Sequence, residues 1–394
     1  DEHAVGVVVG AVRQLGLEVE IVSRICGWSD VSGGNDKDRD NLDPDLERVH
    51  HCPVQTEHDI DTFLDARRDD EFGVLIVMSR VWEAPFTRGL PDLWAPRFKA
   101  IWPHAPVVIW GTDVHASCTP TNHYTRKDEQ GTWIRMLTQL SALASADAVL
   151  SYTPEDNYAL SLYISEHVQL FESPTNHAIP LTGNEIIPSF GSRRGVVMVG
   201  FSHIINIESN LWFLTRVFPL VRRTLVALGR GDQAVASVIG MTKQEATRYA
   251  AQLGYNISDA QGEGIEWRGY VANLSQVFDE ALVATTAVHS CPEFASKNMR
   301  PLARGIPVVT NPHGAQGYGL TDTSGTEGIV VVESGDAQEF AAVVARLLTE
   351  EDWWSQVSRG ALNMMATRFQ KEHVYASVQE PLRHFGASPL RHAE

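Results

Sequence analysis

The chain has 394 residues, of which 43% are hydrophobic, and a formal net charge of −17. This length predicts two or three domains of ~150 residues each, with enough apolar side chains to form buried cores. The charge argues against a nucleic acid as partner, because phosphate recognition needs a basic surface. The sequence also has no run of about 18 apolar residues, the length that a bilayer-spanning helix needs.

Helical patterns alternate with short apolar runs along the first half of the chain. Residues 1–15 predict a helix that Gly16 ends, and residues 18–23 predict a strand. The further expected strands are 73–79, 106–110, 148–152 and 168–172, and the further expected helices are 93–102, 132–146 and 155–164. Continuous apolar runs suit strands that are covered on both faces, so the pattern favours a parallel sheet.

An acidic stretch lies between the first two expected strands. Asp36, Asp38, Asp40 and Glu47 have the spacing of the calcium ligands in an EF-hand loop. However, Asn41 stands where that loop has its glycine, and the flanking residues are not amphipathic helices. A calcium loop and an acidic, solvated loop both stay open; we favour the second and expect no metal site.

The second half repeats the alternation after a polar stretch with proline and glycine, residues 179–195, which is the predicted domain boundary. Arg193 and Arg194 in this stretch are interpreted as ordinary linker charges. The expected strands are 196–200, 236–239, 287–290, 306–310 and 329–332, and the expected helices are 209–227, 337–349, 353–369 and a last one beyond residue 372. A further helix is expected to begin near Asn298 and to end at Gly305, which supplies a left-handed stop. A glycine-rich turn is expected at residues 313–317.

Several motifs occur together in the second half. They are Met198–Pro219, Gly269-Tyr270-Val271, Pro292-Glu293-Phe294-Ala295 with Lys297, Leu302–Val309, Gly314-Ala315-Gln316-Gly317 and Asp336–Ala361. These segments resemble, in order, the donor-binding half of GT-B fold glycosyltransferases, specifically the retaining family 4 (glycosyl transferases group 1) type. The resemblance spans roughly residues 105 to 375. Because it is ordered and collinear, it is more specific than any single motif.

The resemblance implies an α/β fold with two Rossmann-like doubly wound parallel-sheet domains. We expect an acceptor-binding domain at residues 1–188, a nucleotide-sugar-binding domain at 189–370 and a helical segment at 371–394 that packs back on the first domain. The family begins its first domain with a strand, so we expect this first strand to be missing from the sequence given.

The resemblance also implies an activity. It implies transfer of a sugar from a nucleoside-diphosphate sugar to a glycan, lipid or other hydroxyl acceptor, as in polysaccharide biosynthesis. Anomeric configuration would be retained, and neither a metal nor another cofactor would be needed.

Residues in two segments of the sequence are expected to contact the donor diphosphate. Lys297 matches the family lysine that reaches the diphosphate, whereas in isolation it would be a solvated surface lysine. Asn298 follows it at the expected helix start. Gly200 ends a strand, and its lack of a side chain lets a phosphate approach the backbone. His203 and Asn206 follow that glycine, and His203 either assists the phosphate or caps the loop.

Other donor contacts are expected at two strand ends. Tyr270 and Val271 are expected at the nucleotide base, although an aromatic residue there is equally plausible in the core. Gly314 and Ala315 resemble the turn that closes the site, and the alternative is a surface turn without a ligand.

The chain departs from the family at its two donor carboxylates. Arg300 stands where the ribose carboxylate is expected, and Pro292 stands at the sugar carboxylate, with Glu293 one residue out of register. A guanidinium only donates hydrogen bonds, so Arg300 cannot accept one from ribose but could bind a phosphate. The alternatives to a glycosyltransferase are a catalytically degenerate GT-B protein that acts as a binding or regulatory subunit, and a GT-B sugar-nucleotide epimerase.

Asp113 and His115 follow the expected strand at residues 106–110. Ligands bind at the carboxyl ends of parallel strands, and the family often has a histidine or an aspartate there facing the transferred sugar. We therefore expect Asp113, His115 and Glu293 at the reacting sugar, although a single histidine after a strand is more often structural.

Four cysteines without CxxC spacing are few for this length. This usage is typical of a reducing compartment, which predicts a cytoplasmic protein. The negative charge disfavours an anionic membrane surface, but a local basic patch could still give peripheral contact.

Overall fold

The computed structural model describes residues 2–15, 21–23, 51–53, 57–69, 74–78, 90–112, 140–141, 143–173, 188–200, 204–257, 264–289 and 294–386. These residues form two compact units, and each unit is described by itself. The described residues up to 173 and those from 371 onward belong to the first unit, and residues 188–370 belong to the second.

The first unit is built on a four-stranded parallel sheet with the order β3-β4-β5-β6. The strands are β3 (Leu75–Met78), β4 (Val107–Thr112), β5 (Ala148–Ser151) and β6 (Gln169–Glu172). Two further short strands, β1 (Ile21–Ser23) and β2 (His51–Pro53), pair in parallel as a separate sheet. The helices are α1 (Glu2–Gln14), α3 (Glu57–Asp65), α4 (Leu90–Ile101), α6 (Pro154–Ser161) and α15 (Lys371–His384).

The closing helix α15 is part of the core of this first unit. Its Val374 is fully buried in one apolar cluster with Trp110 of β4 and with α1. The Gln379 Nε2 donates a hydrogen bond of 2.8 Å to the Ala11 carbonyl on α1. The last described segment of the chain therefore packs on the first helix, far from it in sequence.

The second unit contains a six-stranded sheet with the order β9-β8-β7-β10-β11-β12, and all its strand pairs are parallel. The strands are β7 (Val196–Val199), β8 (Ala236–Ile239), β9 (Ile265–Gly269), β10 (Val283–Thr286), β11 (Val308–Thr310) and β12 (Ile329–Val331). Most of their residues are buried, as expected for β-branched runs in a sheet that is covered on both faces.

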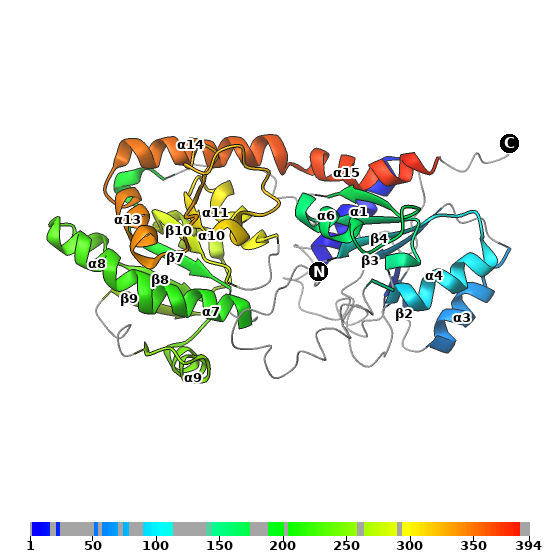
Figure 1. Cartoon of the computed structure of the whole chain (residues 1–394), viewed down its shortest axis with the longest axis horizontal. Helices are drawn as coiled ribbons and strands as arrows, with labels where there is room; N and C mark the ends of the chain where they lie inside the picture. Colours follow the sequence, from blue (N-terminus) through cyan, green and yellow to red (C-terminus); the bar gives the residue numbers. More distant parts are fainter. Residues whose placement is uncertain are drawn as a thin grey trace. The chain divides into compact units, whose positions relative to one another are not determined.

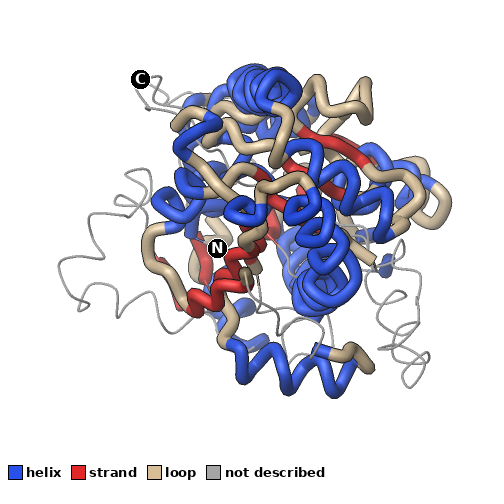
Figure 2. The backbone as a smooth tube through the Cα atoms, turned by 90° about the vertical axis from the view of Figure 1, so that its left-hand side faces the viewer, coloured by secondary structure: helices blue, strands red, loops and turns tan. Residues whose placement is uncertain are grey.

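The helices of this unit lie on both faces of the sheet (Figure 1), and Figure 2 shows the strands in red with helices in blue around them. They are α7 (Ile204–Trp212), α8 (Phe218–Ala227), α9 (Lys243–Leu253), α10 (Leu274–Glu280), α11 (Met299–Ala303), α12 (Pro312–Ala315), α13 (Ala337–Leu347) and α14 (Glu351–Arg368). Helix α8 packs against α13, and α11 packs against α14.

A π-helical turn, Phe213–Val217, joins α7 to α8. The Phe218 amide donates to the Phe213 carbonyl, five residues back. Pro219 accounts for this widened turn, because a proline has no amide hydrogen and its ring clashes with the carbonyl four residues earlier. The helix expected at residues 209–227 thus begins earlier, at Ile204, and continues past Pro219.

The expected strand at 287–290 is wrong, because β10 ends at Thr286. Side chains bind the backbone beyond that residue. The Ala287 amide donates to the Ser209 Oγ at 3.0 Å. The Val288 amide and carbonyl both bond to the Asn311 side chain, at 3.0 and 2.6 Å. The apolar run is therefore buried without being part of the sheet.

The expected turn at 313–317 contains the short helix α12 instead. Asn311 caps this helix by accepting a hydrogen bond from the Gly314 amide, and Pro312 occupies its first position. An asparagine followed by a proline is a helix-start signal that the sequence analysis missed. The left-handed stop at Gly305 is confirmed, with a φ of 63°.

Arg193 is not an ordinary linker charge. Its side chain is only 3% exposed and donates to three carbonyl oxygens, those of Pro188 at 3.0 Å, Ala281 at 3.2 Å and Arg304 at 2.9 Å. The neighbouring Arg194 makes one ion pair of 3.0 Å and is 57% exposed, as expected for a surface charge. Arg193 therefore joins three separate segments of the second unit.

Candidate functional site

The strand order of the second unit reverses between β7 and β10, its first and fourth strands along the chain. In open parallel sheets, ligands bind beyond the carboxyl ends of the strands at the point of reversal. The carboxyl end of β7 leads directly into Gly200, and the segment after β10 leads to Lys297. The topology thus brings these two predicted donor residues to one edge of the sheet.

Gly200, Asn206 and Lys297 form a cluster at this edge, which we call the strand-end cluster. The Lys297 Nζ donates a hydrogen bond of 2.5 Å to the Asn206 Oδ1. Gly200 has a φ of 105°, and a Cβ placed on it would lie 3.4 Å from the Asn206 Nδ2 and 3.7 Å from the Lys297 Cδ. An ammonium, an amide and a backbone segment without a side chain therefore meet in one place. Such a set can bind an anionic oxygen.

Helix α7 brings Asn206 to this point. Asn206 is followed one helical turn later by Ser209 and Asn210, on the same face of the helix. The Ser209 Oγ accepts from the Ala287 amide, and the Asn210 Nδ2 donates to the Gly200 carbonyl at 3.1 Å. This polar face ties α7 to the ends of both central strands. Asn206 was noted after Gly200 in the sequence without a role in the site, and the spacing of Asn206, Ser209 and Asn210 was the signal for one.

The Asn298 side chain is engaged within the fold. It is 1% exposed, its Oδ1 accepts from the Thr286 hydroxyl at 2.7 Å, and its Nδ2 donates to the Gly314 carbonyl at 3.1 Å. Asn298, which was expected at the donor, therefore uses its side chain to link the end of β10 to α12, next to Lys297 in the chain.

Tyr270 lies at the carboxyl end of the edge strand β9 and is 89% exposed. The alternative that it belongs to the core is therefore wrong. Strand β9 is two strands away from β7, which corresponds to about 10 Å at the usual strand spacing. An exposed aromatic ring at that distance from the strand-end cluster is free to stack on a planar base. Val271, which follows it, is half-buried.

The remaining described candidates lie on α11 and α12. Arg300 is exposed, and Ala315 is half-buried. Gly314 is buried, and a Cβ placed on it would lie 2.1 Å from the Thr310 Oγ1 and 3.1 Å from the Thr286 carbonyl oxygen. The protein itself fills the space beside Gly314, so packing accounts for this glycine.

Four of the predicted residues lie outside the described part of the chain. These are Asp113, His115, His203 and Glu293, and the same is true of the acidic stretch from Asp36 to Glu47. Their predicted roles stay predictions.

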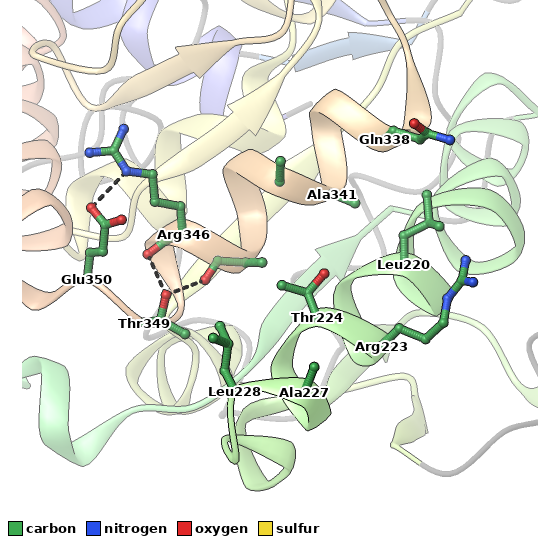
Figure 3. Close-up of a pocket in the computed structure, with 12 residues that line it drawn as sticks. Leu220, Arg223, Thr224, Ala227, Leu228, Gln338, Ala341, Arg346, Thr349 and Glu350 are labelled. Carbon is green, nitrogen blue, oxygen red and sulfur yellow. Dashed lines mark hydrogen bonds and ion pairs between the residues drawn. The ribbon is translucent and has the colours of Figure 1, made fainter.

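A separate surface groove of about 630 Å³ lies between α8 and α13 (Figure 3). Arg223 and Leu228 contribute from the α8 side, and Ala341 and Arg346 from α13. The Arg346 guanidinium pairs with Glu350 at 2.7 Å. Since helices and the residues that directly follow them supply the whole lining, this groove is distinct from the strand-end cluster.

Among the described residues, no three His, Cys, Asp or Glu side chains gather as metal ligands would. Within the same ranges, none of the helices combines the length and the apolar character needed to cross a membrane.

His289, which follows β10, predicts a pH-dependent stability. Burial, together with the neighbouring His313, lowers the pKa of His289 to about 4, and its ring contacts that of Trp212 at a centroid distance of 4.7 Å. The unfolded chain takes up a proton on this ring near pH 6.5, but the folded chain does not. We therefore expect the free energy of unfolding to be highest above about pH 6.5 and to fall by up to ~3 kcal/mol as the pH drops to 4.

Urea unfolding at a series of pH values checks this expectation. In a His289→Gln variant, the free energy of unfolding should lose most of its dependence on pH between pH 6.5 and 4. The matched variant His373→Gln replaces an exposed histidine and should keep it. An unchanged slope in His289→Gln would show that other groups control the acid transition.

Gly200→Ala tests the need for a bare backbone in the strand-end cluster. A φ of 105° is unfavourable for alanine, so we expect a loss of about 1–3 kcal/mol in the free energy of unfolding. The new methyl group would also occupy the space beside Asn206 and Lys297 and so weaken anion binding. Gly191→Ala is the matched control, because its added Cβ has no atom within 4 Å. Calorimetric titration with a nucleoside diphosphate checks the result, and equal affinities in the two variants would contradict it.

Residues 193–350 match the family model described as Glycosyl transferases group 1. This range contains the whole strand-end cluster and Tyr270. No curated protein sequence matches the chain.

Solved structures of similar fold cover nearly the whole chain. The structure of Anabaena Alr3699/HepE in complex with UDP and glucose has a TM-score of 0.61 at 12% identity, covering 97% of this chain and 96% of that one. Sucrose-phosphate synthase from Thermosynechococcus elongatus has a TM-score of 0.61 at 15% identity, covering 96% and 92%. The pneumococcal O-GlcNAc transferase GtfA in complex with UDP and GlcNAc has a TM-score of 0.57 at 13% identity, covering 84% of this chain but 60% of that one. At these identities the similarity concerns the fold. The chain thus has the GT-B fold with two parallel-sheet units, and its second unit contains the segment that matches the glycosyl transferases group 1 model.

Proposed function

We propose that this protein transfers a sugar from a nucleoside-diphosphate sugar to a hydroxyl group of a glycan or lipid acceptor. The observation that carries this proposal is the strand-end cluster of Gly200, Asn206 and Lys297. It lies at the strand reversal of a parallel sheet, inside the segment that matches the family model.

In this proposal the second unit holds the donor. The diphosphate lies against Gly200, and the Lys297 Nζ binds its oxygens in place of Asn206. The base then reaches toward the exposed Tyr270. UDP is the first nucleotide to test, since it is present in the structures of two proteins of similar fold.

The chemical step breaks the bond between the anomeric carbon and the diphosphate oxygen. Negative charge grows on the leaving diphosphate, and the Lys297 ammonium stabilises it, a contribution usually worth ~3 kcal/mol per donor. The acceptor oxygen bonds to the same face of the anomeric carbon, so the configuration is retained. Its proton passes to an oxygen of the leaving phosphate, which requires no metal and no enzymatic nucleophile.

Residues of the first unit and of the segment before Lys297 complete this proposal. Asp113 and His115 follow β4, and in our proposal they bind hydroxyl groups of the transferred sugar. Glu293 precedes the turn that carries Lys297 and would contact the same sugar. Exclusion of water from the reacting carbon would limit hydrolysis of the donor.

A second candidate is a binding subunit that holds a nucleotide or a partner without transferring sugar. The observation in its favour is Arg300, which is exposed on α11 where the family resemblance expects a carboxylate for ribose. A guanidinium cannot accept the ribose hydrogen bonds.

Titration with UDP-, GDP- and dTDP-sugars, followed by an assay of nucleotide release without acceptor, separates these candidates. Binding of one nucleotide sugar with slow release of free sugar and nucleoside diphosphate supports the transferase. Binding without turnover, also in the presence of acceptor mixtures, favours the subunit. If no nucleotide sugar raises the melting temperature, the transferase proposal is wrong.

A further inference from the structure

The turn that carries Lys297 is held by a buried tyrosine from another segment. The Tyr318 hydroxyl donates a hydrogen bond of 2.7 Å to the Ala295 carbonyl. That same carbonyl accepts the Asn298 amide at 2.9 Å, the bond that closes the 3₁₀ turn Ser296–Asn298 around Lys297. Tyr318 therefore binds the oxygen on which the geometry of this turn depends.

The environment of Tyr318 makes this bond a rigid one. The ring is 1% exposed and stacks on Phe294 with a centroid distance of 4.8 Å. Phe369, at the end of α14, packs on it edge-on at 5.5 Å. Because burial raises the pKa of Tyr318 well above its usual range, the hydroxyl stays protonated and can only donate to a carbonyl.

The backbone of Tyr318 is fixed as well. The Arg368 Nη1 donates to the Tyr318 carbonyl at 2.7 Å and to the Gly319 carbonyl at 2.8 Å. The Arg368 Nη2 also pairs with Glu327 at 2.5 Å. A chain of contacts thus runs from α14 through Arg368 and Tyr318 to the turn of Lys297, entirely within the second unit.

We propose that Tyr318 is a positioning residue, which holds the turn of Lys297 so that the ammonium points at the strand reversal when the donor diphosphate arrives. The contacts described above support the role of Tyr318 in holding this turn. The effect of Tyr318 on diphosphate binding rests in addition on the proposed function.

Tyr318→Phe tests this proposal, because it removes one hydroxyl and keeps the aromatic stack. Ser358→Ala is the matched control. It removes another buried hydroxyl of the same unit, which donates to the Gly305 carbonyl at 2.6 Å, beyond the C-terminal end of α11. The two variants should therefore show similar melting temperatures.

Hydrogen exchange and UDP titration of both full-length variants give the two readouts. In Tyr318→Phe, the amides of residues 296–299 should exchange about fivefold faster, and UDP should bind about five- to tenfold more weakly. The KM for a nucleotide sugar should rise by a similar factor as the UDP affinity falls. Ser358→Ala should change neither the exchange of these amides nor the binding of UDP.

The outcomes separate the two proposals. Unchanged exchange at residues 296–299 would overturn the positioning role, since the turn would then hold its shape without the hydroxyl. Faster exchange with UDP affinity equal to that of Ser358→Ala would overturn the link to the diphosphate. If the unmodified protein binds no nucleotide, the proposed function fails, while the exchange data still decide whether Tyr318 holds the turn.

Discussion

Replacing Lys297 with methionine is expected to weaken UDP binding by about 10- to 100-fold, the effect of losing one hydrogen bond to a charged group. The half-buried ammonium beside Gly200 is the cation of the strand-end cluster, and methionine keeps the length of the side chain without its charge. The loss in kcat/KM for the nucleotide-sugar donor should be larger, about 10²- to 10³-fold, because charge on the diphosphate grows during bond breakage.

Lys243→Met is the matched control for this variant. Lys243 begins α9 in the same unit and is exposed. Its replacement changes the net charge by the same amount, so it should leave UDP affinity within a factor of two or so. Calorimetric titration at two salt concentrations separates a direct contact from a general charge effect. If the two variants bind UDP with equal affinity, Lys297 is a solvated surface lysine and does not contact the diphosphate.

Replacing Arg193 with methionine is expected to lower the free energy of unfolding of the second unit by about 2–4 kcal/mol. Burial lowers the pKa of this guanidinium to about 10, so its charged form is partly disfavoured, but it satisfies three carbonyl oxygens. Methionine would remove the cost of burying a charge, which stabilises the unit. It would also leave these three carbonyl oxygens without their hydrogen-bond donor, which destabilises it. We expect the second effect to dominate, since the three carbonyls belong to segments that the arginine joins.

Arg194→Met is the control at the neighbouring position. Its guanidinium makes one exposed ion pair with Glu266, and such pairs contribute ~0–1 kcal/mol. Urea unfolding measures the difference, and hydrogen exchange of β7 assigns it to the second unit. Equal stabilities of the two variants would mean that water replaces the buried guanidinium at little cost.

Local patterns predicted most of the sheets. Residues 236–239 were expected as a strand and form β8, and residues 329–332 were expected where β12 lies. The failure at 287–290 has a physical reason. An apolar run indicates burial, but whether its amides bond to a strand or to side chains depends on Ser209 and Asn311, which are distant in sequence.

The candidate site was predictable only in part, for the same reason. Lys297 and Gly200 were expected from motifs, because each occupies a position that short-range sequence defines. Asn206 was noted after Gly200 but given no role, and Tyr318 was not expected, since the role of each depends on a partner on another element. The carboxyl-end location of the cluster follows from the strand order, which no local pattern encodes.

The sequence by itself determined the alternation of strands and helices, the parallel character of the sheets, the stop at Gly305 and the ordered motifs around Lys297. These properties depend on the chemistry of a few consecutive residues. Only the tertiary structure decided the rest: where β10 ends, that Arg193 is buried, and that Gly200, Asn206 and Lys297 meet. Each of these depends on hydrogen bonds between segments far apart in the chain, which form only when the sheet assembles in its reversed order.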